Sequence, residues 1–168
     1  MPARRMPRPA RKASEPGTST GRRSEGTGLQ VTRFRMESRR NAVAPAVERV
    51  IAASLPAGLT QEQTDNLAVA VAEALSNAAV HGNRLKTGTH VRVKIAVKPG
   101  CATVDISDTG PGFDIAAVSD PTHPERVMAT GGRGVFLMRR LVDDVEFNQA
   151  GNRVRLTVRR RRRRAVRK

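Results

Sequence analysis

The sequence predicts an α+β fold, a two-layer α/β sandwich in which helices cover one face of a mixed, mainly antiparallel sheet. Three observations lead to this prediction. Apolar residues recur at helical spacing in two long segments, they alternate with polar residues in several short ones, and turn sequences that contain glycine join neighbouring alternating segments. The 168 residues suffice for one modest domain with tails.

The amino-terminal part of the domain is expected to form a strand over residues 29–36 and a helix over residues 41–54. The apolar residues of this helix lie on one face, namely Val43, Val47, Val50 and Ile51. Asn41 is the expected N-cap, because its side chain can accept a hydrogen bond from the first turn. Pro45 falls in that turn, where a missing N–H costs little, and residues 55–58 break the helix.

A longer helix is expected to begin after Thr60 and to end near Gly82. Thr60 and Gln63 have the spacing of a capping box, in which each side chain binds the other residue's backbone N–H. The apolar side of this helix consists of Leu67, Val71, Ala74, Leu75 and Ala78. That side is predicted to pack on the sheet.

The rest of the domain is predicted to contain two hairpins and one more helix. Strict alternation in residues 91–97 and 102–106, with Pro99-Gly100 between them, indicates an antiparallel pair of strands. Residues 135–142 are expected to form the third helix. Residues 145–158 then form the closing hairpin, so that the helices and strands together make the two layers.

The net charge of +16 belongs mainly to the ends of the chain. Residues 1–28 hold seven basic and two acidic residues, and residues 159–168 hold eight basic residues and no acidic one. We expect a disordered basic N-terminal tail over residues 1–28, a folded domain over residues 29–158 and an arginine-rich C-terminal tail over residues 159–168. The C-terminal tail could contact nucleic-acid phosphates without sequence preference, although a solvated tail is the simpler explanation.

Composition also excludes several classes of protein. Tryptophan and tyrosine are absent, and four phenylalanines are too few for a platform that stacks single-stranded nucleic acid. No apolar stretch reaches the length of a membrane span, so no membrane association is expected. The one cysteine, Cys101, rules out an intramolecular disulfide framework, and a reduced cytoplasmic setting is the simplest expectation.

The most informative segment is residues 73–83, which closes the second predicted helix. Glu73 and Asn77 are one helical turn apart and therefore point the same way. A carboxylate and an amide oxygen that converge at a helix end suit a hard cation and a polarised hydroxyl or water. His81, further along the same helix, is expected to bind nearby backbone at the helix end rather than to act in catalysis.

Two glycine-rich segments follow this helix. Asp108 comes directly after a predicted strand, and it precedes Gly110 and Gly112, where a side chain would block a ligand. An acid at such a place could accept a hydrogen bond from an exocyclic amine. Gly132 and Gly134 open the third helix, whose backbone N–H groups could face an anion such as phosphate.

The order and spacing of these three segments resemble the N, G1 and G2 boxes of the GHKL ATPases, which share the Bergerat fold. The similarity is strongest to the short anti-sigma-factor serine/threonine kinases of the RsbW and SpoIIAB type, and it covers residues 29–158. Neither basic tail belongs to it. The resemblance implies a Bergerat ATP-binding fold, with ATP and Mg²⁺ as cofactors.

The resemblance also implies roles for the residues of the first two boxes. Glu73 takes the position of the general base, and Asn77 takes the position of the Mg²⁺ ligand. Asp108 matches the acid that binds the adenine amino group. Gly110 and Gly112 match glycines that let the backbone pass close to the nucleotide.

The third box is implied to bind phosphate. Gly132 and Gly134 match glycines whose amides meet the phosphates, and residues 114–130 correspond to the loop known as the ATP lid. Arg126 and Arg133 lie in or beside this loop, where either could reach the terminal phosphate or could instead be a solvated surface residue.

The function implied by the resemblance is that of a regulatory kinase. Such a protein binds ATP, sequesters a sigma factor and phosphorylates a serine or threonine of a STAS-type anti-sigma antagonist. Relatives of this kind commonly dimerise, so a homodimer is expected. Two alternatives stay open. One is a non-catalytic module that closes on ATP to bind a partner, which Thr130 in place of an arginine of the family favours, and the other is a basic nucleic-acid-associated protein.

Overall fold

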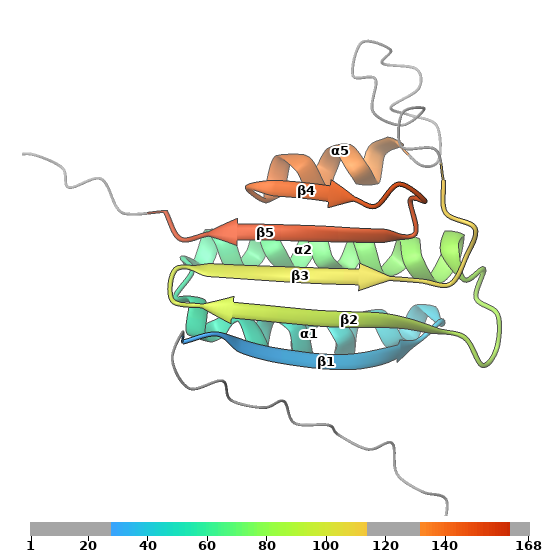
Figure 1. Cartoon of the computed structure of the whole chain (residues 1–168), viewed down its shortest axis with the longest axis horizontal. Helices are drawn as coiled ribbons and strands as arrows, with labels where there is room; N and C mark the ends of the chain where they lie inside the picture. The colour runs from blue at the N-terminus through green and yellow to red at the C-terminus, as the bar shows by residue number, and fades with distance from the viewer. Residues whose placement is uncertain (1–27, 114–131, 162–168) are drawn as a thin grey trace, which may run out of the picture.

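The computed structural model describes residues 28–113 and 132–161. Five strands form one sheet in the order β1-β2-β3-β5-β4, and each described pair of neighbours is antiparallel. The strands are β1 (Gln30–Glu37), β2 (His90–Lys98), β3 (Cys101–Ser107), β4 (Asp144–Phe147) and β5 (Arg153–Arg159) (Figure 1).

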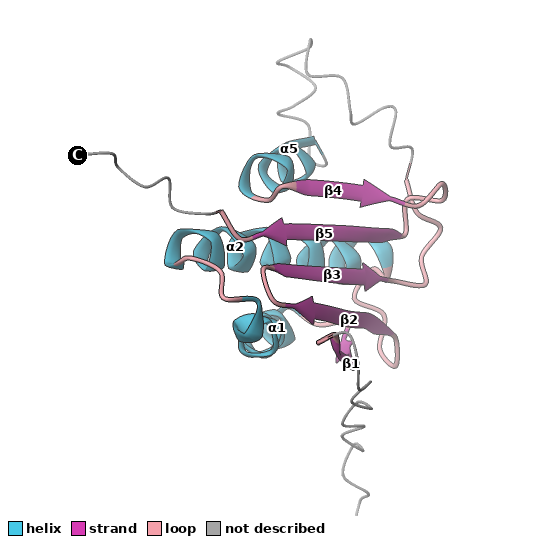
Figure 2. Cartoon of the chain, turned by 60° about the vertical axis from the view of Figure 1, so that its left-hand side comes forward, coloured by secondary structure: helices cyan, strands magenta, loops and turns pink. Residues whose placement is uncertain are grey.

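The described α-helices all lie on one face of this sheet, as Figure 2 shows. They are α1 (Val43–Ser54), α2 (Gln61–Asn77) and α5 (Gly132–Leu141). Short 3-10 turns at Arg40–Ala42 and Leu55–Ala57 flank α1, and a π turn at Ala78–Gly82 extends α2. This architecture confirms the predicted α+β fold with helices on one face of a mainly antiparallel sheet. The predicted mixed character of the sheet is not found among the described strands.

The two layers meet in one apolar core. Alternate residues of β2 and β3 face the helices and are almost completely buried, namely Val91, Val93, Ile95, Val97, Ala102, Val104 and Ile106. Leu67, Val71 and Leu75 of α2 are part of the same core, and each is 0% exposed. This burial specifies the strand register, because a slip by one residue would turn charged side chains into the core.

The start of α2 has the predicted capping box. The N–H of Gln63 donates to Oγ1 of Thr60 at 3.2 Å, and the N–H of Thr60 donates to Oε1 of Gln63 at 3.3 Å. Gln63 is buried, and its Nε2 also donates to the carbonyl oxygen of Arg159 at 2.7 Å. The first turn of α2 is therefore tied to the last strand, which fixes where the helix lies along the sheet.

The start of α1 differs from the prediction. Asn41 lies inside the preceding 3-10 turn, and the N-cap position belongs to Ala42, which provides no side-chain cap. The N–H of Ala42 already donates to the carbonyl oxygen of Arg39 at 3.1 Å, so the turn itself leads the chain into the helix. Pro45 lies in the first turn of α1, as predicted.

Several expectations concern residues outside the described part of the chain. The loop 114–130 and most of both tails lie there, so the predicted domain limits stay predictions. None of the described helices combines the length and the apolar character that crossing a membrane requires.

Candidate functional site

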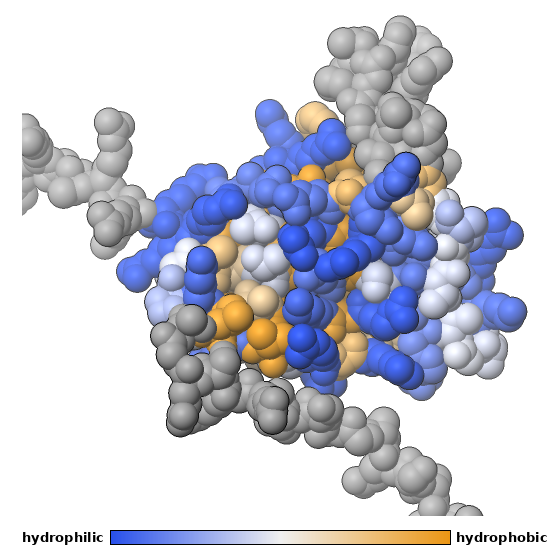
Figure 3. All heavy atoms as spheres, in the orientation of Figure 1, coloured by the Kyte–Doolittle hydropathy of each residue, from blue (hydrophilic) through white to orange (hydrophobic). Residues whose placement is uncertain are grey.

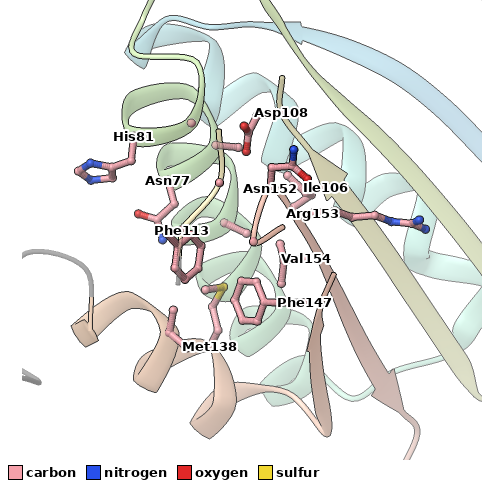
Figure 4. Close-up of a pocket in the computed structure, with 16 residues that line it drawn as sticks. Asn77, His81, Ile106, Asp108, Phe113, Met138, Phe147, Asn152, Arg153 and Val154 are labelled. Atoms are coloured by element: carbon pink, nitrogen blue, oxygen red, sulfur yellow. The ribbon is translucent and has the colours of Figure 1, made fainter. Parts of the chain in front are cut away.

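A cavity of about 320 Å³ opens between α2, α5 and the neighbouring ends of β3 and β5 (Figure 4). Its walls include the apolar side chains of Phe113, Met138 and Phe147, while Asn77 and Asp108 contribute polar atoms. The rings of Phe113 and Phe147 meet edge to face with their centroids 5.5 Å apart. Apolar walls with a few polar groups are typical of small-molecule sites, and aromatic walls suit a flat ligand.

Asp108 directly follows β3, lines the cavity and is 9% exposed. Its Oδ1 accepts the N–H of Gly110 at 2.7 Å, and its own N–H donates to the carbonyl oxygen of Asn152 at 3.1 Å. Burial raises the pKa of this carboxyl above its usual value of 3.8, and the backbone hydrogen bonds offset that only in part. Oδ2 accepts no hydrogen bond from a described residue, so a donor on a ligand can use it.

Three glycines allow close packing beside this carboxyl and in the turns next to it. A Cβ at Gly82 would overlap the side chain of Asp108, and a Cβ at Gly110 would overlap the carbonyl oxygen of Gly82. Gly112 has a φ of +80°, and a Cβ there would overlap the carbonyl oxygen of Ala150. The two predicted glycines after β3 are therefore required by close backbone packing at the edge of the cavity.

The side chain of Asn83 fixes the turn after β3 through hydrogen bonds to Thr109. The sequence did not predict this role. Asn83 is 5% exposed, and its Oδ1 accepts both the N–H of Thr109 at 2.9 Å and the hydroxyl of Thr109 at 2.8 Å. Its Nδ2 donates to Oγ of Ser38 at 2.8 Å. One amide thus joins the end of α2, the turn after β3 and the end of β1. Its place directly after Gly82 was the available signal, but its distant partners cannot be inferred from spacing.

Glu73 and Asn77 lie one turn apart at the end of α2, as predicted. Asn77 lines the cavity where the helix gives way to the π turn, a feature that is frequent at functional sites (Figure 4). Glu73 is not part of the cavity wall. It lies against the first turn of α5, where a Cβ at Gly134 would overlap its Oε1.

The glycines expected to open the third helix lie within its first turn. The helix α5 begins at Gly132, so Gly132 and Gly134 are its first and third residues. The N–H groups at the start of a helix lack partners inside it and carry the positive end of its dipole. Arg133, one of the two arginines that could reach the terminal phosphate, is exposed in this turn, whereas Arg126 lies outside the described residues.

Asn152 borders the cavity just before β5. Its Nδ2 donates to the carbonyl oxygen of Gly110 at 3.2 Å, and its Oδ1 accepts Nδ2 of Asn148 at 2.8 Å. The side chain of Arg153 points away from the cavity (Figure 4), and its guanidinium binds Asp105 instead. Asn152 therefore supplies the polar side chain of the cavity at this edge.

His81 lies at the cavity and is exposed. Its side chain makes no hydrogen bond with a described residue, so the expected bond to nearby backbone is not found. In the described part of the chain, no group of three or more His, Cys, Asp and Glu side chains could hold a metal ion. A cation at Asn77 would thus take most of its ligands from a bound molecule or from water.

Comparison with known proteins finds one matching domain family and several similar proteins. Residues 35–158 match the family described as the histidine kinase-like ATPase domain. The serine-protein kinase RsbW of Oceanobacillus iheyensis is 31% identical over 97 residues, which are 54% of this chain and 61% of that protein. The serine-protein kinase RsbW of Bacillus subtilis is 29% identical over 107 residues, 60% of this chain and 67% of that protein. The anti-sigma F factor of Clostridium botulinum is 29% identical over 118 residues, 66% of this chain and 82% of that protein.

Proposed function

The chain belongs to the histidine kinase-like ATPase domain family, and on that premise we propose that it binds ATP in the cavity and transfers the terminal phosphate to a serine or threonine hydroxyl of a partner protein. One observation carries the proposal. The buried carboxyl of Asp108 and the amide of Asn77 line the same apolar cavity, and Glu73 lies one turn before Asn77 against the start of α5.

The adenine ring of ATP suits the apolar part of the cavity. Its exocyclic amine can donate to Oδ2 of Asp108, and the rings of Phe113 and Phe147 offer it aromatic contacts. A volume of about 320 Å³ lies at the low end of the roughly 300–1,000 Å³ range of small-molecule sites. We therefore expect the nucleoside inside the cavity and the phosphates at its opening.

The phosphates suit the first turn of α5. This helix has ten residues, and its free N–H groups and dipole favour an anion. Gly132 and Gly134 keep side chains away from part of that turn. Asn77 is the proposed protein ligand of Mg²⁺, which usually takes one or two protein oxygens and completes its shell with phosphates and water.

Glu73 is the proposed general base. Its carboxylate would accept the proton of the substrate hydroxyl while the hydroxyl oxygen bonds to the terminal phosphorus and the bond to the bridging oxygen breaks, which releases ADP. The contact of Glu73 with Gly134 supports this role, because it brings the base to the helix end at which the phosphates are proposed to bind.

The partners are proposed from the relatives, which carry the names serine-protein kinase RsbW and anti-sigma F factor. We propose a sigma factor as the sequestered partner and a STAS-type antagonist as the phosphorylated one, in the cytoplasm. The chain spans 61% of the length of the Oceanobacillus relative, so these partners need their own test. A homodimer and a nucleic-acid contact of the basic tails remain expectations from the sequence.

Calorimetric titration with Mg-ATP tests the nucleotide site. Asp108→Asn keeps the size of the side chain and removes its charge. It should weaken binding by about tenfold or more, because a hydrogen bond to a charged group is worth about 1.5–3 kcal/mol. Asp65→Asn is the matched control, since this exposed carboxylate on α2 binds only Gln61 among the described residues. Unchanged affinity in Asp108→Asn would refute the adenine site.

Transfer of labelled phosphate from ATP to a STAS-type antagonist tests the kinase reaction. Glu73→Gln should slow the transfer by about 10²- to 10⁴-fold while ATP still binds. Glu62→Gln, in the first turn of the same helix, is the matched control. If the wild-type protein binds ATP and labels no antagonist, the non-catalytic module becomes the better description.

A further inference from the structure

The sheet face without a described helix carries many charged residues. It faces the viewer in Figure 1 and Figure 3, and Figure 3 shows hydrophilic side chains over much of it. Side chains that alternate with the core positions point to this face, and the strand register arranges them in rows. One row consists of Arg35, Arg92, Ser107 and Arg153, and the next consists of Arg33, Lys94, Asp105, Arg155 and Glu146.

Basic residues oppose one another directly on β1 and β2. Arg35 is paired in register with Arg92, and Arg33 is paired with Lys94. The three arginines are exposed and the lysine is half-buried. None of the four forms an ion pair with a described residue. Like charges placed opposite each other destabilise an antiparallel pair, so this arrangement gives the isolated sheet no benefit.

On β3, β4 and β5, the charged residues of these two rows form ion pairs with one another. Asp105 is 6% exposed, and its Oδ1 binds Nη2 of Arg153 at 2.7 Å and Nε of Arg155 at 3.0 Å. Burial raises the pKa of Asp105, but the hydrogen bonds and charges of the two arginines outweigh it and hold the pKa below 3.8. Arg155 also approaches Glu146 at 3.7 Å. Within these two rows, the basic residues without an ion-pair partner among the described residues are therefore those of β1 and β2.

The four basic residues of β1 and β2 line a broad groove of about 1050 Å³, which we call the basic groove. Three acidic residues, Glu37, Asp105 and Asp108, also line it. Glu37 is paired with Arg39 at 3.0 Å and Asp105 with its two arginines, while Asp108 lies at the border with the cavity. The groove thus has a positive centre with carboxylates at its margins, namely Glu37 beside the row of Arg35, Asp105 beside Lys94, and Asp108 at the border shared with the cavity.

We propose that the basic groove binds an acidic segment of a partner protein, a short stretch with several aspartate or glutamate side chains. Guanidinium groups bind carboxylates through two parallel hydrogen bonds, and three of the four basic residues of β1 and β2 that line the groove are arginines. A short segment can place its carboxylates over the positive centre and end before the margins. Charge complementarity therefore selects this occupant.

Other occupants fit the basic groove less well. A continuous phosphate backbone would pass close to Glu37 or Asp105, which repel it. The aromatic ring beside the groove, that of Phe34, is covered by the guanidinium of Arg49 at 4.4 Å and offers a base no free face on that side. A second copy of this chain would bring the same positive charge to the groove and be repelled.

The proposal does not rest on ATP binding or on phosphotransfer. The basic groove and the cavity share Asp108, Asn152 and Arg153 at their borders, but the unpaired cations of β1 and β2 do not line the cavity. Substitution of those cations should therefore leave the affinity for ATP unchanged. Binding of an acidic peptide to the groove and binding of ATP to the cavity can therefore be tested independently.

Fluorescence anisotropy of the full chain with a labelled peptide of alternating glutamate and alanine tests the proposal. The alternation puts the carboxylates on one face of an extended segment. The double variant Arg35→Gln/Arg92→Gln should weaken binding by about tenfold or more at physiological ionic strength. Arg84→Gln/Lys86→Gln removes the same charge from exposed positions in the loop before β2, and should change the affinity less than about twofold.

Thermal unfolding separates binding from folding. Arg35→Gln/Arg92→Gln should be at least as stable as the wild type, because a repulsive cross-strand pair is removed. Equal peptide affinity in the two double variants would overturn the proposal. So would tighter binding of an oligothymidylate of equal charge through the same two arginines, since the occupant would then be a nucleic acid. Self-association that depends on those arginines would also overturn it.

Discussion

Replacement of Gly134 by alanine should separate the stability of the domain from its proposed chemistry. Gly134 lies in the first turn of α5, and a Cβ there would overlap Oε1 of Glu73. That oxygen is the far end of a flexible side chain, so the carboxylate can move aside. At Gly112 the situation differs, because the added Cβ would overlap the backbone carbonyl oxygen of Ala150.

The effects of Gly134→Ala on folding nearly cancel. Alanine stabilises a helix relative to glycine by up to about 1 kcal/mol, and displacement of Glu73 from its preferred rotamer costs about 0.5–1.5 kcal/mol. We therefore expect the free energy of unfolding to change by less than about 1 kcal/mol, or a few degrees in Tm. The transfer of phosphate should fall by about 10²- to 10⁴-fold, because the displaced carboxylate no longer accepts the proton.

Circular dichroism melting, ATP calorimetry and labelled phosphate transfer measure these effects on one preparation. The double variant Gly134→Ala/Glu73→Gln should transfer phosphate no more slowly than Glu73→Gln alone, since both changes remove the same group. Near-normal transfer by Gly134→Ala would refute the argued role of the contact. A loss of stability as large as that of Gly112→Ala would show that the contact serves folding.

Three further changes follow from contacts around the cavity and the sheet. The affinity for ATP should fall as the pH is lowered toward the pKa of Asp108, which is raised above 3.8, and Asp108→Asn should lack this dependence in calorimetry. Asp105→Asn should lower the free energy of unfolding at neutral pH by roughly 1–2 kcal/mol, because its arginine partners are partly exposed. In urea unfolding this difference should shrink as the pH falls below 3.8 through the lowered pKa of Asp105, since protonation removes the same stabilisation from the wild type. Asn83→Ala should lower the free energy of unfolding by roughly 1–3 kcal/mol, because it leaves Thr109 without its acceptor, and it should weaken ATP binding. Unaltered ATP affinity in a destabilised variant would exclude Asn83 from the site.

Most helices and strands could be predicted because their causes are local. The capping box of Thr60 and Gln63 joins residues on one turn, and the alternation in β2 and β3 reflects one buried face. The prediction that Asn41 caps α1 was wrong, because Asn41 lies inside a 3-10 turn and Ala42 takes the N-cap position. The 3-10 turn that leaves β1 leads directly into the helix, and local preference for an asparagine cap did not override that path.

The site was predictable in its residue types and only partly in its contacts. Spacing and the family resemblance singled out Glu73, Asn77, Asp108 and the glycines, and the structure brings Asn77 and Asp108 to one cavity. It places Glu73 outside that cavity against α5, a contact that depends on how two helices pack. Periodicity within a helix says nothing of its neighbour, so this placement could not be derived beforehand.

The amino-acid sequence on its own specified which segments become helices and strands, and which acidic residues and glycines lie at their ends. These features depend on residues only a few positions apart in the chain. Packing alone joins Asn83 to Ser38 and Thr109, and it alone sets Arg35 opposite Arg92. Such contacts link residues far apart in the chain, and they exist only once the sheet has its register and the helices lie on it.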